Sequence, residues 1–296
     1  MSYLVQALVN GLLQGGLLAL VAAGFTLVWG ILNVVNLAHG AMVVLGACLT
    51  WELVAGAGLN PVLAAVAVAV AMFGFGYALQ RGLLNLVARA PALLQILVTF
   101  GVGLLLNYVV VAVFSTDDRA LSSAYTQPVL AFGRVYVPTV RLVALLVAVA
   151  VIAVSTLALR RTRYGLAIRA VGMERDAARL MGIRVRHAYA VTFGVGAALA
   201  GAAGALVAVI GVFSPASTTA TTFTLQSFVI AVIGGVGSLP GAFAGGLLLG
   251  VFEALAAQYL PGSLVSAIAL GVLVLAMLVR PHGLAGQGRS AWLENW

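Results

Sequence analysis

Few side chains in this sequence could carry out bond chemistry. Of the 296 residues, 15 are Lys or Arg, 7 are Asp or Glu and 3 are His, and every one of the positive residues is Arg. A P-loop needs a Lys that reaches the phosphates, and a Schiff base needs a Lys amine, so the sequence excludes both. The single cysteine, Cys48, excludes an intrachain disulfide and a multi-cysteine metal site.

The remaining polar candidates lie inside or beside long apolar runs. Glu253 lies about seven residues from the end of such a run, and a carboxylate there is a functional-site candidate because burying a charge in lipid is costly. Asn36, His39 and Gly237 lie where two other runs are interrupted. Two interpretations stay open: these residues line a transport path, or they tie helices together, with Glu253 hydrogen-bonded to Ser, Thr or Gln of a neighbouring helix.

The elements that must position these residues are membrane helices. The chain is 63% hydrophobic and 7% charged, whereas globular proteins carry about 25% charged residues. Each crossing of a membrane takes ~20 helical residues. We therefore predict one all-α membrane domain over residues 1–296, a polytopic helical bundle of about eight to nine spans with broken helices. The apolar runs are 4–31, 33–55, 61–80, 92–115, 141–160, 187–211, 223–238, 240–260 and 262–280.

Two interruptions carry information about a path. The 223–238 run ends in Gly234-Gly235-Val236-Gly237-Ser238-Leu239-Pro240-Gly241, which cannot be regular helix throughout. The chain also breaks just after the first run, near Asn33 and Asn36. Because freed backbone groups in lipid are costly, both breaks must be buried in protein or line a wet cavity. We expect them to lie near Glu253, around a cavity between two half-repeats.

The distribution of Arg predicts the orientation. Nine crossings place 12 of the 15 Arg on one side, eight of them between residues 160 and 186, and three on the other. Because cytoplasmic loops collect Arg, the N-terminus is predicted outside and the C-terminus in the cytoplasm. The net charge of +8 is then explained by topology and by anionic membrane lipids, and it does not require nucleic acid.

The 160–186 loop is the only long charged segment. A short helix is expected from Glu174 to Met181, since acids occupy its first turn and Gly182 can supply a left-handed C-terminal residue. Ala177, Ala178, Leu180 and Met181 would form its apolar face. Such a helix suits a groove on a partner protein. The alternative is a plain positive-inside loop.

This loop resembles the coupling loop of ATP-binding cassette (ABC) importer permeases, in particular the branched-chain amino acid permeases of the LivH type. The resemblance covers essentially the whole chain. It rests on Gly24-Phe25-Thr26-Leu27-Val28-Trp29-Gly30, Asn36-Leu37-Ala38-His39-Gly40, Arg161-Thr162-Arg163-Tyr164-Gly165, Gly182-Ile183, and the run from Ile233 to Gly241 continuing to Glu253.

The resemblance implies a permease subunit in a bacterial inner membrane that moves branched-chain amino acids and is not an enzyme. Implied partners are a second permease (a LivM-like paralogue or the chain itself), two cytoplasmic ABC ATPases, and a periplasmic or lipid-anchored binding protein. No cofactor is expected in the chain, because the ATPases bind ATP, and no metal. Gly165, Glu174, Ala177, Ala178, Leu180, Met181 and Gly182 would couple to the ATPase. Urea or amide permeases of the same family, or an ion-coupled secondary transporter, remain alternatives.

Overall fold

The computed structural model describes residues 2–88, 90–121, 129–132, 135–261, 270–274, 276, 278, 283 and 284. Seven of the described helices are long and apolar enough to cross a membrane. They are α1 (Ser2–Leu32), α2 (His39–Trp51) with the π-helical η1 (Glu52–Gly56), α3 (Pro61–Leu79) with η2 (Gln80–Leu84) and α4 (Asn85–Val87), α5 (Ala92–Phe114), α6 (Thr139–Arg161), α9 (Val185–Ile210) and α11 (Leu239–Tyr259).

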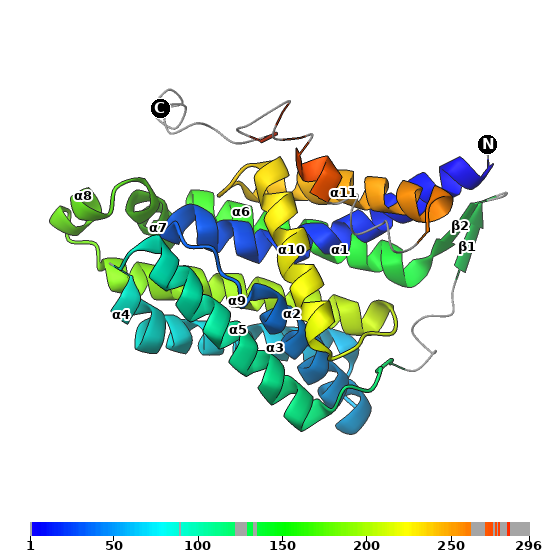
Figure 1. The fold of residues 1–296 in the computed structure, drawn as a ribbon, viewed down its shortest axis with the longest axis horizontal. Coiled ribbons are helices and arrows are strands. Elements are labelled where there is room, and N and C mark those ends of the chain that lie inside the picture. Colours follow the sequence, from blue (N-terminus) through cyan, green and yellow to red (C-terminus); the bar gives the residue numbers. More distant parts are fainter. Residues whose placement is uncertain are drawn as a thin grey trace.

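The shorter elements complete the all-α membrane bundle. A further apolar helix, α10 (Ser217–Gly234), crosses the others steeply (Figure 1). Helices α7 (Arg163–Met173) and α8 (Arg175–Leu180) project from one end of the molecule, which we call the α7–α8 end. An antiparallel hairpin of β1 (Val129–Phe132) and β2 (Val135–Pro138) lies at the opposite end of the molecule, near the N-terminus. We call this the hairpin end. This hairpin is the one β-sheet that the described residues form, and the apolar pattern did not predict it.

Eight of the nine predicted runs are helical over most of their length. The ninth, 262–280, lies largely outside the described residues. Local signals explain several helix starts. Before α3, the Asn60 side chain accepts a hydrogen bond from the Val62 amide at 2.9 Å, and Pro61 occupies the first helical position; both are favourable at a helix N-terminus.

The centre of the bundle is built from small residues. Helix α9 is rich in buried Gly and Ala and packs against α1, α2 and α3, while α1 packs along α11. A Cβ atom added to Gly250 would lie 2.5 Å from Cα of Gly15, so the two helix backbones touch there. Without a strong hydrophobic drive inside lipid, such close backbone approach is a principal source of helix association.

The outer helices show the opposite pattern. In α3, α5 and α6, at most 22% of the most apolar 18-residue stretch is buried. Their exposed side chains are large and apolar, such as Val66 on α3, Leu105 on α5 and Leu146 on α6, all about 60% exposed. This arrangement suits a lipid or protein environment rather than water.

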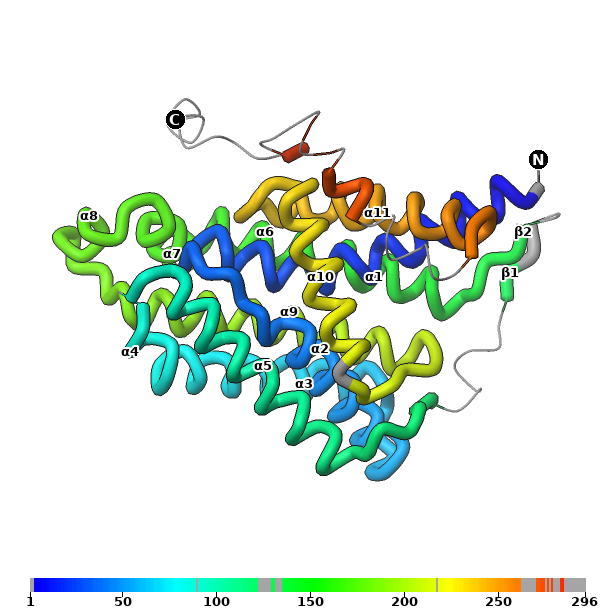
Figure 2. Tube along the Cα trace, viewed as in Figure 1, coloured from blue at the N-terminus to red at the C-terminus, as the bar shows by residue number. Residues whose placement is uncertain are grey.

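Two interruptions divide the central helices into helix–break–helix units. The first joins α1 to α2 through residues 33–38, and Asn33 there has a φ of +55°. The second joins α10 to α11 through residues 235–238, where Gly235 and Gly237 have φ values of +97° and +85°. Figure 2 shows both breaks as turns in the trace, with α2 beginning well inside the bundle rather than at its end.

Candidate functional site

The α6–α7 junction is a tight, capped turn. Oγ1 of Thr162 accepts a hydrogen bond from the amide of Gly165 at 3.0 Å, which caps the start of α7. Gly165 is buried, and a Cβ atom there would collide with the carbonyl oxygens of Ala158 and Leu159 at the end of α6. Gly165 therefore allows α7 to fold back closely on α6.

Helix α8 confirms the helix predicted around residues 174–181, and it has a well-defined end. Gly182 has a φ of +81°, as predicted for a left-handed C-terminal residue. Its amide bonds to the carbonyl of Arg179 at 3.0 Å, and the amide of Ile183 bonds to that of Ala178 at 3.0 Å. This pair of bonds is the Schellman motif, which satisfies carbonyl groups that the helix end leaves free.

The predicted apolar face of α8 is split between two sides. Ala177 is exposed, and Leu180 and Met181 are 88% and 83% exposed. These three positions are spaced three and four residues apart and share one side of the helix. Ala178 differs: it is 4% exposed and packs with Tyr189 in a small apolar cluster. Ala178 therefore does not share the exposed side with the other three residues, because its direction, about 100° from that of Ala177, points it into the chain.

The first break lies deep in the bundle. Nε2 of His39 is 2.7 Å from the carbonyl oxygen of Val21, which lies 11 residues, or about 16 Å, before the end of α1. Oδ1 of Asn36 accepts a hydrogen bond from the amide of Ala38 at 3.1 Å. Both side chains are buried, so this break places polar groups well inside the bundle and protein surrounds them, as its backbone requires.

The second break rests on the last turns of α1. The amide of Gly237 donates a hydrogen bond to Oγ1 of Thr26 at 3.0 Å. A Cβ atom on Gly30 would collide with Cα of Gly237. The positive φ and this close contact both favour glycine at position 237.

Glu253 is held by amide side chains from two other helices. Nε2 of Gln226 on α10 donates to Oε1 at 2.9 Å, and Nε2 of Gln14 on α1 lies 3.5 Å from Oε2. Glu253 is 6% exposed, so its side chain faces the interior of the protein. These are the contacts that the helix-tying interpretation predicted.

The sequence suggested that the path candidates lie around one cavity, but the structure does not gather them there. The four candidates are Asn36, His39, Gly237 and Glu253. Glu253 lies 14 positions after Leu239, the first residue of α11, so it is about 20 Å along that helix from the Gly237 break. It is nearer to the first break: the amide of Gly40 donates to Oγ1 of Thr224 at 3.0 Å, two residues before Gln226 on α10. Thr224 and Gln226 are two residues apart on α10, which corresponds to a rotation of about 200° around the helix axis. The two side chains therefore lie on opposite sides of α10, and this helix separates Glu253 from the contact between Gly40 and Thr224.

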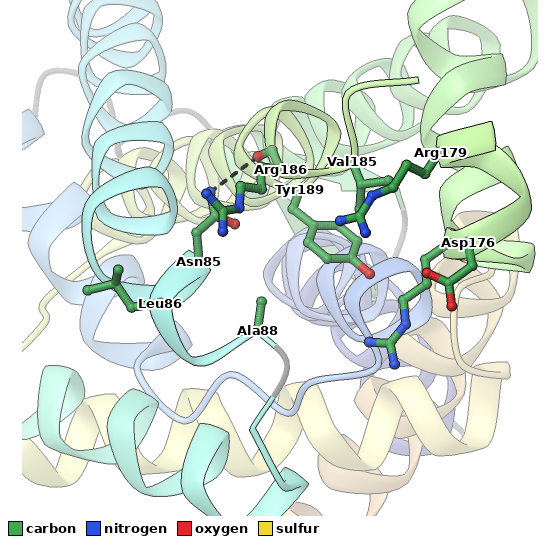
Figure 3. A pocket seen from close by; sticks show the side chains of 9 residues that line it. Asn85, Leu86, Ala88, Asp176, Arg179, Val185, Arg186 and Tyr189 are labelled. Atoms are coloured by element: carbon green, nitrogen blue, oxygen red, sulfur yellow. Dashed lines mark hydrogen bonds between the residues drawn. The ribbon is translucent and has the colours of Figure 1, made fainter. Parts of the chain in front are cut away.

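Three adjoining recesses open at the α7–α8 end, and Ala88 and Tyr189 line all three. Their volumes are about 390, 570 and 20 Å³. The largest lies between the end of α1, Gln95 on α5 and Arg175 on α8. Figure 3 shows the 390 Å³ recess, with Tyr189 on one side and Asn85 of α4 on another. No local pattern pointed to Tyr189 or Asn85, because only the tertiary fold brings α4, α8 and α9 together.

A profile of the family described as "Branched-chain amino acid transport system / permease component" matches residues 7–277. The chain belongs to this family. It is 32% identical over 296 residues to the high-affinity branched-chain amino acid transport system permease protein BraD of Pseudomonas aeruginosa, with 96% of each chain covered.

Other members of the family are similarly close. The identity to the permease protein LivH of Escherichia coli strain K12 is 30% over 297 residues, again with 96% of each chain covered. A probable LivH permease of Methanocaldococcus jannaschii is 27% identical over 294 residues, covering 94% of this chain and 91% of the relative. No solved structure matches the chain.

Membership in this family fits the rest of the structure. The relatives are transport permeases rather than enzymes, and the apolar helices make this chain a multi-pass membrane protein. In the described residues, no group of three or more His, Cys, Asp or Glu side chains could hold a metal ion. What the fold offers instead is a set of interrupted helices and one projecting helix, α8.

Proposed function

We propose that the chain is the translocation subunit of an ABC importer that carries branched-chain amino acids across the bacterial inner membrane. The family match over residues 7–277 supports the substrate class, because the curated relatives are named for it. The observation that carries the mechanism is α8, a capped helix that presents Leu180 and Met181 almost fully exposed at the end of the bundle.

The proposed orientation puts the α7–α8 end in the cytoplasm. The eight Arg residues of the 160–186 segment lie in or beside α7 and α8, and Arg81 lies at the same end, where its guanidinium donates to the hydroxyl of Tyr77 near His187. Arg119 and Arg141 belong to the hairpin end. Because cytoplasmic loops collect Arg, the N-terminus would lie outside; the C-terminus, which we place in the cytoplasm, lies outside the described residues.

In this assembly α8 would insert into a groove on an ABC ATPase, with Ala177, Leu180 and Met181 as apolar contacts. Glu174 and Gly182 set the two ends of α8, and Gly165 allows the tight turn in which α7 folds back on the end of α6. Ala178 would hold α8 to its own chain instead of contacting the partner. Exposed apolar side chains on a short, capped helix suit recognition by a groove.

The remaining partners follow from the same proposal. Two ATPases would bind the ATP, so the chain itself needs no cofactor. A second permease, a paralogue or another copy of this chain, would cover part of the apolar faces of α3, α5 and α6, and membrane lipids would cover the rest. A periplasmic or lipid-anchored binding protein would deliver the amino acid at the hairpin end.

We place the path beside the two interrupted helices. Non-helical backbone at membrane depth is tolerated where it is buried in protein or lines a cavity, and transporters use such breaks at their substrate sites. Asn36 and His39 mark the first break and Gly237 the second. Glu253, sealed between Gln14 and Gln226, would be the group whose contacts change when α1, α10 and α11 move.

Two variants of α8 test the proposal. Ala177→Arg places a long charged side chain on the exposed face, and Gly182→Val forces a β-branched residue into a φ of +81°, which costs on the order of 1–3 kcal/mol. We expect both proteins to insert normally, to lose most ATP-driven leucine uptake, and to retain less ATPase on purification.

The matched controls are Ala177→Ser, which keeps a small side chain, and Arg163→Ala, which removes an exposed charge from the same segment. Both should transport leucine as the wild type does. Normal uptake and normal ATPase retention in Ala177→Arg would refute the assignment of α8.

A further inference from the structure

The 390 Å³ recess at the α7–α8 end is strongly basic. Three Arg side chains and one Asp side chain contribute to its lining, and they come from α8 and from the start of α9. The volume lies in the range of small-molecule sites, about 300–1,000 Å³. Its lining residues are Asn85, Leu86, Ala88, Arg175, Asp176, Arg179, Val185, Arg186 and Tyr189.

The positive-inside tendency alone does not explain this convergence. It requires Arg in a cytoplasmic loop, but it does not require three of them to line one recess. Arg175 and Arg179 are four residues apart on α8, where like charges repel and destabilise a helix. In the described part of the chain, no ion pair with a carboxylate compensates any of the three Arg side chains. Figure 3 shows the carboxyl group of Asp176 apart from the guanidinium of Arg179.

The walls of the recess are fixed by packing and by hydrogen bonds. Tyr189 is 8% exposed and belongs to the apolar cluster that holds Ala178. Nδ2 of Asn85 donates to the backbone carbonyl of Arg186 at 3.3 Å, which ties α4 to the start of α9. In Figure 3 the side chain of Arg179 points from α8 toward Val185 and Tyr189, which line the same recess.

We propose that this recess binds a phosphate group, carried by an anionic phospholipid or supplied as free phosphate. The planar guanidinium group presents paired donors that match phosphate oxygens, and Arg clusters are the usual solution for such ligands. Leu86, on α4 at the recess, is 79% exposed. A basic cavity with an exposed apolar residue beside it suits a headgroup at the membrane surface, and basic pockets of this kind bind anionic lipids in membrane proteins.

A bound phosphate would hold α8 against α9. Arg175 and Arg179 come from α8 and Arg186 from α9, so one ligand would bridge the two elements and offset the repulsion within α8. The binding itself does not depend on the transport assignment. Its effect on coupling rests on the proposed function, because it requires that α8 contacts an ATPase.

Binding is tested with the purified full-length chain. The probe is fluorescent phosphatidylglycerol, titrated into chain reconstituted in phosphatidylcholine nanodiscs. Saturable binding is expected, and Arg179→Gln and Arg186→Gln should each weaken it about fivefold, since an Arg near an anionic lipid contributes about 1 kcal/mol. Arg163→Gln, an exposed Arg on α7 outside the recess, is the matched control and should bind as the wild type does.

Competition with inorganic phosphate identifies the source of the group. Displacement of the lipid by millimolar phosphate supports a free-phosphate site, and resistance to displacement supports a lipid headgroup site. The proposal is wrong if Arg179→Gln and Arg186→Gln bind phosphatidylglycerol as the wild type does, or if Arg163→Gln loses as much affinity as they do. Loss of affinity with unchanged ATP-driven uptake would uphold the binding site and remove only its role in coupling.

Discussion

The contact between α1 and α11 gives the sharpest test of the packing. A Cβ atom on Gly250 would lie 2.5 Å from both Cα of Gly15 and the carbonyl oxygen of Gly11, about 1 Å closer than carbon atoms pack. These neighbours are backbone atoms, so Gly250→Ala must push two helices apart. On α5, by contrast, a Cβ atom on Gly101 meets no atom within 4 Å, which makes Gly101→Ala the matched control.

The difference in unfolding free energy between the two variants measures the cost of overpacking at the α1–α11 contact. Each gains the same helix propensity, about 0.8–1.0 kcal/mol for Ala over Gly. Only Gly250→Ala also suffers overpacking, which costs about 1–3 kcal/mol. At about 2–4 °C per kcal/mol, the midpoint of thermal unfolding should be roughly 2–12 °C lower for Gly250→Ala than for Gly101→Ala.

The assay is thermal unfolding of the two variants and the wild type in the same detergent, followed by the loss of monodisperse protein. Separation of α1 from α11 should also weaken the 3.5 Å contact between Gln14 and Glu253. Equal midpoints for Gly250→Ala and Gly101→Ala would refute the reasoning, because they would show that the α1–α11 contact is loose enough to accept a methyl group.

Three further changes have expected outcomes in the same unfolding assay. Gln226→Leu removes the 2.9 Å hydrogen bond to Glu253 and should lower the free energy of unfolding by about 1–3 kcal/mol. The double variant with Glu253→Leu should recover most of that loss, and no recovery would contradict the pairing of the two side chains. Asn60→Ala should cost about 1 kcal/mol through loss of the α3 cap, and Asn60→Asp should not; equal effects would count against the cap. Arg119→Lys should lower the free energy of unfolding by about 0.5–2 kcal/mol, because the guanidinium lies 4.0 Å from the ring centre of Trp51. An unchanged unfolding midpoint would show that this contact does not stabilise the protein.

Hydropathy predicted most of the fold, because long apolar runs in a membrane have few alternatives to helices. The start of α10 shows where the signal fails. The predicted run began at residue 223, but the helix begins at Ser217, since Thr222 and Thr224 bond their hydroxyls to carbonyls four residues earlier at 2.9 and 3.0 Å. Such internal bonds let polar side chains enter an apolar helix, and a hydropathy window does not register them.

The candidate site was predictable only where the signal was local. The end of α8 at Gly182 follows from sequence, because a left-handed residue favours glycine. The inward direction of Ala178 does not, since it depends on where α9 places Tyr189. In the same way, a Gly-rich stretch indicates a break near Gly237 but not its distance from Glu253, which the length of α11 decides.

The energy source and cargo of uptake test the central claim most directly. The transporter would be assembled from this chain with candidate permease, ATPase and binding-protein partners from the same genome, in proteoliposomes that contain ATP. The account predicts uptake of labelled leucine that requires ATP and the binding protein, that persists when ionophores collapse ion gradients, and that excess isoleucine, but not urea, inhibits. Leucine uptake by the chain alone, driven by an ion gradient without ATP, would contradict it.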